Sequence, residues 1–112
     1  MDIGQKLVHM ITSELLPKDF STGSKGFYAS AKITAGGVRY QCQAQAVLVG
    51  SKNDATAVVD ATAEEMGAAL AGVLGALKPR TFKSGRTGYR AAAKVEVRGQ
   101  LFQSSIQAVR LV

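Results

Sequence analysis

Two segments of the chain carry apolar side chains at the three- and four-residue spacing of one helical face. They are residues 2–15 and residues 62–77. In the second, Thr62 and Glu65 have the spacing of a capping box, and Asp60 offers an alternative cap. A proline stands two residues after each segment, and proline disfavours a helical conformation of the residue before it. The pattern therefore predicts two helices that end before these prolines.

Beyond each helical segment, polar and apolar side chains alternate in two runs separated by a short turn. The turn is Gly36-Gly37 in the first half and Arg98-Gly99 in the second, and such pairs favour hairpins. Alternation with a period of two indicates strands with one covered face and one open face. Each half therefore reads as a helix followed by two strands.

The second half repeats the first at an offset of 62 residues. Residues 15–50 and 77–112 are identical at 13 of 36 aligned positions, and the matches include glycines, prolines and apolar strand residues. Such self-similarity at a fixed offset indicates an internal duplication.

The duplication leads to a specific fold prediction. We expect a single α+β domain over residues 1–112, made of two αββ repeats at 1–50 and 62–112 that are joined by a linker at 51–61. The simplest arrangement is a four-stranded antiparallel sheet with both helices on one face.

Charge is distributed unevenly along the chain. The net charge is +6, but residues 18–52 carry +4 and residues 78–112 carry +7, whereas residues 1–17 and 53–77 carry −1 and −4. The positive excess is therefore confined to the segments that contain the predicted strands. Such segregation favours a polyanionic partner, although a basic surface also serves solubility alone.

The composition favours an intracellular protein. There is one cysteine, which excludes an intramolecular disulfide and an all-cysteine metal site. The start of the chain does not resemble a signal peptide, and the longest apolar stretch, residues 66–77, is shorter than the roughly 20 residues that span a bilayer. We expect a cytoplasmic or nucleoid-associated protein without a membrane partner.

Two short loops, TGSKG and SGRTG, repeat a Gly-x-x-Gly spacing around a basic residue. Glycine lets successive amide groups turn inward, so such a loop can cradle a phosphate. A turn between a helix and a strand would explain the same glycines. The context fits neither a Walker loop nor a dinucleotide-binding fingerprint. The candidate phosphate-binding glycines are Gly23, Gly26, Gly85 and Gly88.

The open face of the predicted sheet is basic and rich in glutamine. Lysine neutralises phosphates, tyrosine and arginine stack on bases, and glutamine can bond base edges or sugars. A plain solvated sheet face is the competing explanation. With the loops, the candidate nucleic-acid-binding residues are Lys25, Tyr28, Lys32, Arg39, Arg80, Lys83, Arg86, Arg90 and Lys94, and Phe27 and Tyr89 are further candidates for stacking.

Apolar and small residues suggest association between copies. The polar face becomes apolar near the strand ends, which a monomer would leave partly exposed. The second helix also has a small-residue stripe, although burial against its own sheet would explain it equally. We expect a homodimer or a larger ring. The positions concerned are Val47, Val49, Val109 and Leu111 on the strands and Gly67, Ala71 and Gly75 on the helix.

Few residues favour catalysis. His9 has no counterpart in the second half, Cys42 lies on the covered side of a strand, and the carboxylates are scattered without the grouping of a metal site. We therefore expect that the protein is not an enzyme and has no catalytic residue. We also expect no cofactor, metal or small-molecule substrate.

These patterns together predict a small basic nucleic-acid-binding protein. Single-stranded DNA or RNA is favoured over sequence-specific duplex, with binding largely through backbone electrostatics and some stacking. The alternative is a structural or assembly subunit of a homo-oligomer that docks on an acidic protein partner.

Overall fold

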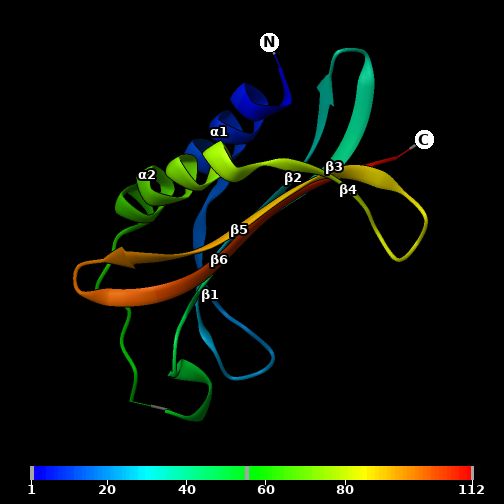
Figure 1. Ribbon diagram of the computed structural model, residues 1–112. Coiled ribbons are helices and arrows are strands. Elements are labelled where there is room, and N and C mark those ends of the chain that lie inside the picture. Colours follow the sequence, from blue (N-terminus) through cyan, green and yellow to red (C-terminus); the bar gives the residue numbers. More distant parts are fainter. Residues whose placement is uncertain (1, 55, 112) are drawn as a thin grey trace.

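Six antiparallel strands form one sheet in the computed structural model, which describes residues 2–54 and 56–111. The strand order is β1-β2-β3-β6-β5-β4, and both helices lie on one face of the sheet (Figure 1). The first half contributes β1 (Leu16–Asp19), β2 (Lys25–Ala35) and β3 (Val38–Leu48), and the second half contributes β4 (Lys78–Thr81), β5 (Thr87–Val97) and β6 (Gln100–Arg110).

The α+β class is confirmed, but the predicted four-stranded sheet is wrong. Each half has an additional four-residue strand, β1 or β4, which pairs with the first residues of β2 or β5. These strands contain Pro17 and Pro79, and proline is accepted there because both strands lie at the sheet edges. The Gly-x-x-Gly loops therefore join two strands of a hairpin and do not join a helix to a strand.

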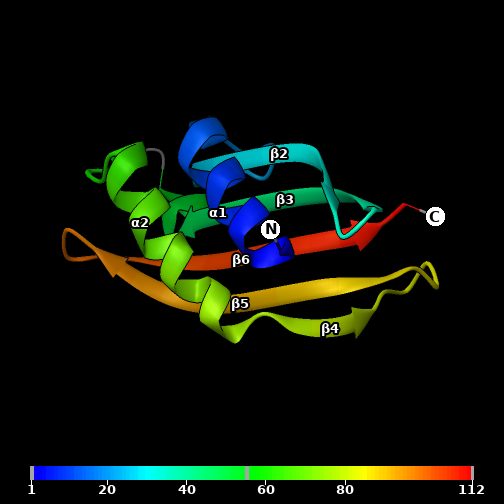
Figure 2. The same cartoon turned by 90° about the horizontal axis from the view of Figure 1, so that it is seen from above.

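Both helices begin at a capping box. Helix α1 (Ile3–Glu14) is capped by Asp2 with Gln5, which the sequence analysis did not predict. Helix α2 (Ala63–Val73) is capped by Thr62 with Glu65, so of the two caps predicted there Thr62 is the one used. A 3-10 turn, η2 (Leu74–Ala76), continues α2 toward β4, and a second, η1 (Ser51–Asn53), follows β3. Seen from above, α1 lies over the first-half side of the sheet and α2 over the second-half side (Figure 2).

An approximate two-fold axis relates the halves. The central strands β3 and β6 pair antiparallel with Ala44 opposite Ile106, and these two residues are equivalent at the 62-residue offset. Because both helices lie on the same face, the axis passes through this pair perpendicular to the sheet. Equivalent residues on the open face are therefore placed symmetrically about the centre of the sheet.

The core between the helices and the sheet keeps the same symmetry. Phe27 packs on Phe102 with ring centroids 6.3 Å apart, and the equivalent pair, Tyr89 and Tyr40, has centroids 6.2 Å apart at the same angle of 53°. Around these aromatic pairs, the largest fully buried aliphatic side chains come from both helices and the central strand β6. They are Leu7, Ile11, Met66, Leu70 and Ile106.

The linker between the halves forms hydrogen bonds with strands from both of them. The Lys25 ammonium donates to the Ala57 carbonyl at 2.7 Å. The Gln100 side chain donates to the Val58 carbonyl at 2.7 Å and accepts from the Asp60 amide at 2.8 Å. The described part of the linker is thus held against β2 and β6.

Candidate nucleic-acid interface

The face of the sheet opposite the helices carries a basic surface, which we call the open face. Side chains alternate along each strand, so residues paired across neighbouring strands share a face. The cations of this face, nearly all on its outer strands, are Lys18, Lys32, Arg39, Lys78, Arg80, Arg90 and Lys94. The central strands β3 and β6 present the neutral side chains of Gln41, Gln43, Gln45, Gln103, Ser105 and Gln107. Among the described residues of this face, Glu96 is the one carboxylate.

Two cations stand directly opposite each other on this face. Lys78 of β4 pairs with Arg90 of β5, and Arg90 pairs in turn with Gln107 of β6. Like charges directly opposite on neighbouring strands destabilise a sheet. A bound anion between or above these two side chains would remove that repulsion.

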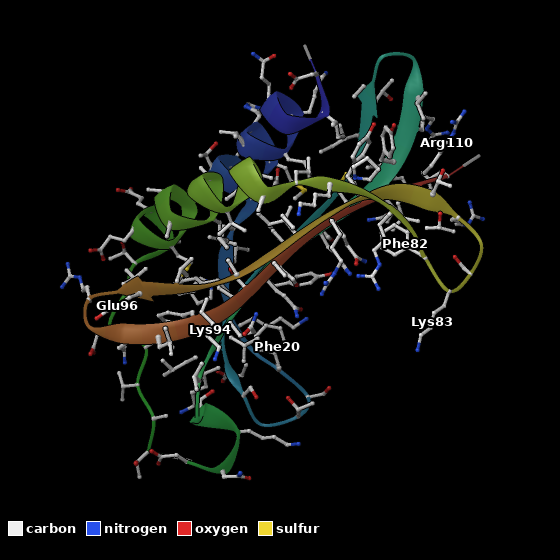
Figure 3. All side chains as sticks on the ribbon, viewed as in Figure 1. Phe20, Phe82, Lys83, Lys94, Glu96 and Arg110 are labelled. Atoms are coloured by element: carbon white, nitrogen blue, oxygen red, sulfur yellow. The ribbon has the colours of Figure 1, made fainter. Side chains whose placement is uncertain are left out.

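Aromatic rings lie beside cations at the outer strands. The Lys18 ammonium is 4.5 Å from the centre of the Tyr28 ring and 5.6 Å from that of Phe20. In the second half, the Arg80 guanidinium is 5.6 Å from the centre of the Phe82 ring. Figure 3 shows Phe20 and Lys94 on the side of the sheet opposite the helices. Each outer edge thus combines charge with an aromatic plane.

Six of the predicted binding residues lie together on the open face, and three do not. Lys25 lies at the start of β2 and points toward the linker, where it bonds Ala57. The Arg86 guanidinium donates to the carbonyl groups of Arg110 at 3.2 Å and Leu111 at 2.7 Å. Lys83 extends outward from the loop between β4 and β5 (Figure 3). The six on the open face are Tyr28, Lys32, Arg39, Arg80, Arg90 and Lys94.

Backbone geometry accounts for all four glycines of the repeated loops. Gly23 and Gly85 have φ of 92° and 85°, which glycine adopts readily, and their amides donate to Phe20 and Phe82 within the turn. A Cβ atom at Gly26 or Gly88 would overlap the backbone of the neighbouring strand. Their participation in phosphate binding stays a prediction, but the hairpins need these glycines without any ligand.

The sequence interpretation missed Lys18, Lys78, Phe20 and Phe82 as members of this surface. They lie in or next to β1 and β4, the two strands that the hydrophobic pattern did not predict. A signal was present, because Phe20 and Phe82 are identical at the 62-residue offset and Lys18 is matched by Arg80. Repeated aromatic and basic residues beside a proline could have marked both edges.

Two residues considered for stacking lie on the covered side. Phe27 is 1% exposed in the core, and Tyr89 is half-buried against Tyr40. Of the positions considered for association, Gly67 is buried next to Ile11 of α1, whereas Val49 is 51% exposed at the end of β3.

The single cysteine of the sequence, Cys42, is buried. Burial raises the pKa of the Cys42 thiol to about 11, so this thiol is protonated and unreactive at neutral pH. Residues 2–54 and 56–111 contain no cluster of three or more histidine, cysteine or acidic residues suited to a metal ion. Neither helix in these residues has the length and hydrophobicity needed to cross a bilayer.

The comparisons with known proteins give no further assignment. No protein-family model and no curated protein matches the sequence, and no solved structure matches the fold. The open face is therefore the feature from which a function can be inferred.

Proposed function

We propose that this protein binds nucleic acid on the open face of its sheet, with single-stranded DNA or RNA as the favoured ligand. The observation that carries the proposal is the cross-strand pairing of Lys78 with Arg90. This pair lies on a face that offers seven cations and a single carboxylate among its described residues. A phosphate backbone along the outer strands would neutralise these charges.

The distribution of side chains supports a single strand laid across the sheet. Tyr28 is half-buried and shares the face with three glutamines of β3, and its hydroxyl donates to Gln43 at 3.0 Å. A base can stack on such a ring while the neighbouring amides bond to base edges or sugars. With few aromatic side chains on the face, charge supplies most of the affinity.

Fluorescence anisotropy tests this proposal with labelled oligo-dT, oligo-U and a duplex of equal length at two salt concentrations. The double variant Lys78→Ala/Arg90→Ala removes two cations from the open face. We expect it to weaken binding by tenfold or more and to lower the slope of log K against log salt by about 1.4, at ~0.7 for each single-strand phosphate contact.

A matched control is Lys6→Ala/Lys52→Ala, which removes two cations from α1 and η1, outside the sheet. We expect this control to bind almost as the natural protein does. An equal loss in both double variants would show that net charge matters and the open face does not. Binding to none of the oligonucleotides at low salt would contradict the proposal and favour an acidic protein partner for the same face.

A further inference from the structure

The two long outer strands have unpaired edges in the described part of the chain. β4 covers only the first residues of β5, so residues 91–97 pair with β6 on one side and have no strand on the other. Residues 29–35 of β2 are in the same position beyond β1. An unpaired edge of this length is a template for pairing with another chain.

The two edges differ in charge. The β2 edge carries Lys32 and Thr34 on the open face. The equivalent residues of the β5 edge are Lys94 and Glu96, so only the β5 edge combines a base with an acid. A lysine in the middle of an edge strand ordinarily discourages pairing. Two antiparallel copies of β2 would bring Lys32 side chains close together without any acid to offset them.

The β5 edge is complementary to itself. If two copies pair antiparallel about a two-fold axis at Val95, Lys94 of each faces Glu96 of the other. Opposite charges directly across an antiparallel pair are stabilising. Glu96 takes part in no ion pair within the described residues, where its cross-strand neighbour is Leu101. On the covered side the same register places Ala93 opposite Val97 and Val95 opposite itself.

The helices also leave the two edges differently accessible. Side chains of α1, including Lys6, His9 and Glu14, line a hollow together with residues 31–34 of β2. In α2 and η2, by contrast, every exposed residue from position 66 to 76 is alanine or glycine. Ala93 and Val95 are only half-buried against the core and would be covered by a second strand.

We infer that a second copy of this chain binds along residues 93–97 of β5, so that two six-stranded sheets join into one continuous sheet. The contact is an antiparallel β5–β5 pair centred on Val95, fixed in register by two Lys94–Glu96 pairs. The inference does not depend on nucleic-acid binding, and it concerns the protein alone.

Sedimentation velocity over a range of protein concentrations tests the dimer without nucleic acid. We expect Glu96→Lys to raise the dimer dissociation constant about tenfold or more, because both favourable pairs become like-charge pairs. The swap Lys94→Glu/Glu96→Lys keeps the complementarity and should restore the dimer. Thr34→Lys introduces a lysine at the equivalent position of β2 and should leave the dimer intact. A monomer at all concentrations, or a dimer insensitive to Glu96→Lys, would overturn the inference.

A disulfide cross-link tests the register independently of charge. In the Val95→Cys variant two cysteines meet at the axis, where directly opposite Cβ atoms lie about 4.5–5.5 Å apart, close to disulfide reach. The natural Cys42 is fully buried and does not compete. We expect a covalent dimer on a non-reducing gel for Val95→Cys and none for the equivalent Ile33→Cys. Equal cross-linking of both folded variants, or of neither, would overturn the proposed interface.

Discussion

Tyr28 in the first half and Arg90 in the second occupy equivalent positions on the open face, at an offset of 62 residues. Leu16, which pairs with Tyr28, is matched by Lys78, which pairs with Arg90. Six residues further along the strands, Thr34 is matched by Glu96. The glycines of the two repeated loops and the aromatic pairs of the core are retained in both halves, and Arg98 takes the positive φ of its counterpart Gly36. The backbone requirements of the fold are thus kept in both copies, whereas the chemistry of the exposed surface has diverged.

The largest contrast in stability is expected between the equivalent core positions Phe27 and Tyr89. Phe27 is 1% exposed, so Phe27→Ala should lower the free energy of unfolding by about 3–5 kcal/mol. Tyr89 is half-buried near the edge, and Tyr89→Ala should cost only about 1–2 kcal/mol. Urea unfolding followed by circular dichroism measures both. Equal losses would show that the two aromatic pairs support the fold equally.

The glycines that approach a neighbouring strand should behave alike in both halves. Gly26→Ala and Gly88→Ala each place a methyl group against the backbone of β3 or β6, and each should destabilise the protein by roughly 1–3 kcal/mol. Gly72→Ala is the control, because a Cβ atom at Gly72 would meet open space on α2. This variant should stabilise the protein by up to ~1 kcal/mol. A neutral result at Gly88 alone would mean that the halves differ at this approach.

The glycines of the repeated loops also show how much of the structure could be predicted from the sequence. Their repetition predicted two related loops, and the turns at Gly36-Gly37 and Arg98-Gly99 and the cap at Thr62 were predicted correctly. The strands β1 and β4 were missed because four residues that include a proline give no readable alternation. The pairing that makes them strands is supplied by β2 and β5, and local propensity does not encode it.

The directions in which the long basic side chains point could likewise not be predicted from the sequence. Lys25 and Arg86 stand in repeated basic loops, yet they donate to carbonyl groups of the linker and of the last residues of the chain. Arg80, in a segment that the pattern left without a strand, lies on the open face. Which acceptor a flexible cation reaches depends on segments that only tertiary structure brings close.

Replacing Tyr28 and Arg90 separately should divide the two contributions to nucleic-acid binding. Tyr28→Ala removes a stacking plane worth ~1–3 kcal/mol per base and should weaken binding without changing its salt dependence. Arg90→Ala should lower the log–log salt slope by ~0.7, because one phosphate contact is lost. Anisotropy titrations with oligo-dT at three salt concentrations separate these effects. A changed slope in Tyr28→Ala would contradict the division.

The smallest expected effect distinguishes the caps of the two helices. The backbone hydrogen bond with Thr62 and the contact with Arg98 lower the pKa of Glu65, whereas α1 uses the uncharged Gln5 at the same capping position. A lowered folded-state pKa stabilises the protein above the unfolded value of about 4.3, and this contribution is lost as pH falls through the folded-state pKa.

Melting temperatures between pH 3 and pH 7 measure this difference. Glu65→Gln should lower the melting temperature slightly at neutral pH and flatten its decline toward acid. Gln5→Ala removes the corresponding side-chain hydrogen bond of α1, and it should lower the melting temperature by the same amount at every pH. If the melting temperature of Glu65→Gln falls with pH in parallel with that of the natural protein, this carboxylate does not contribute to the loss of stability in acid.

The pairing of Ala44 with Ile106 at the centre of the sheet has a consequence for how the chain folds. Each half can form its hairpin, β2–β3 or β5–β6, between residues close in sequence. Joining β3 to β6 requires closing a chain segment of about 60 residues, whose entropic cost is met only when both hairpins present their edges. We therefore expect the two halves to form first and the closing of the β3–β6 pair to limit the folding rate, so that mutations at this pair slow folding more than mutations at the outer strands.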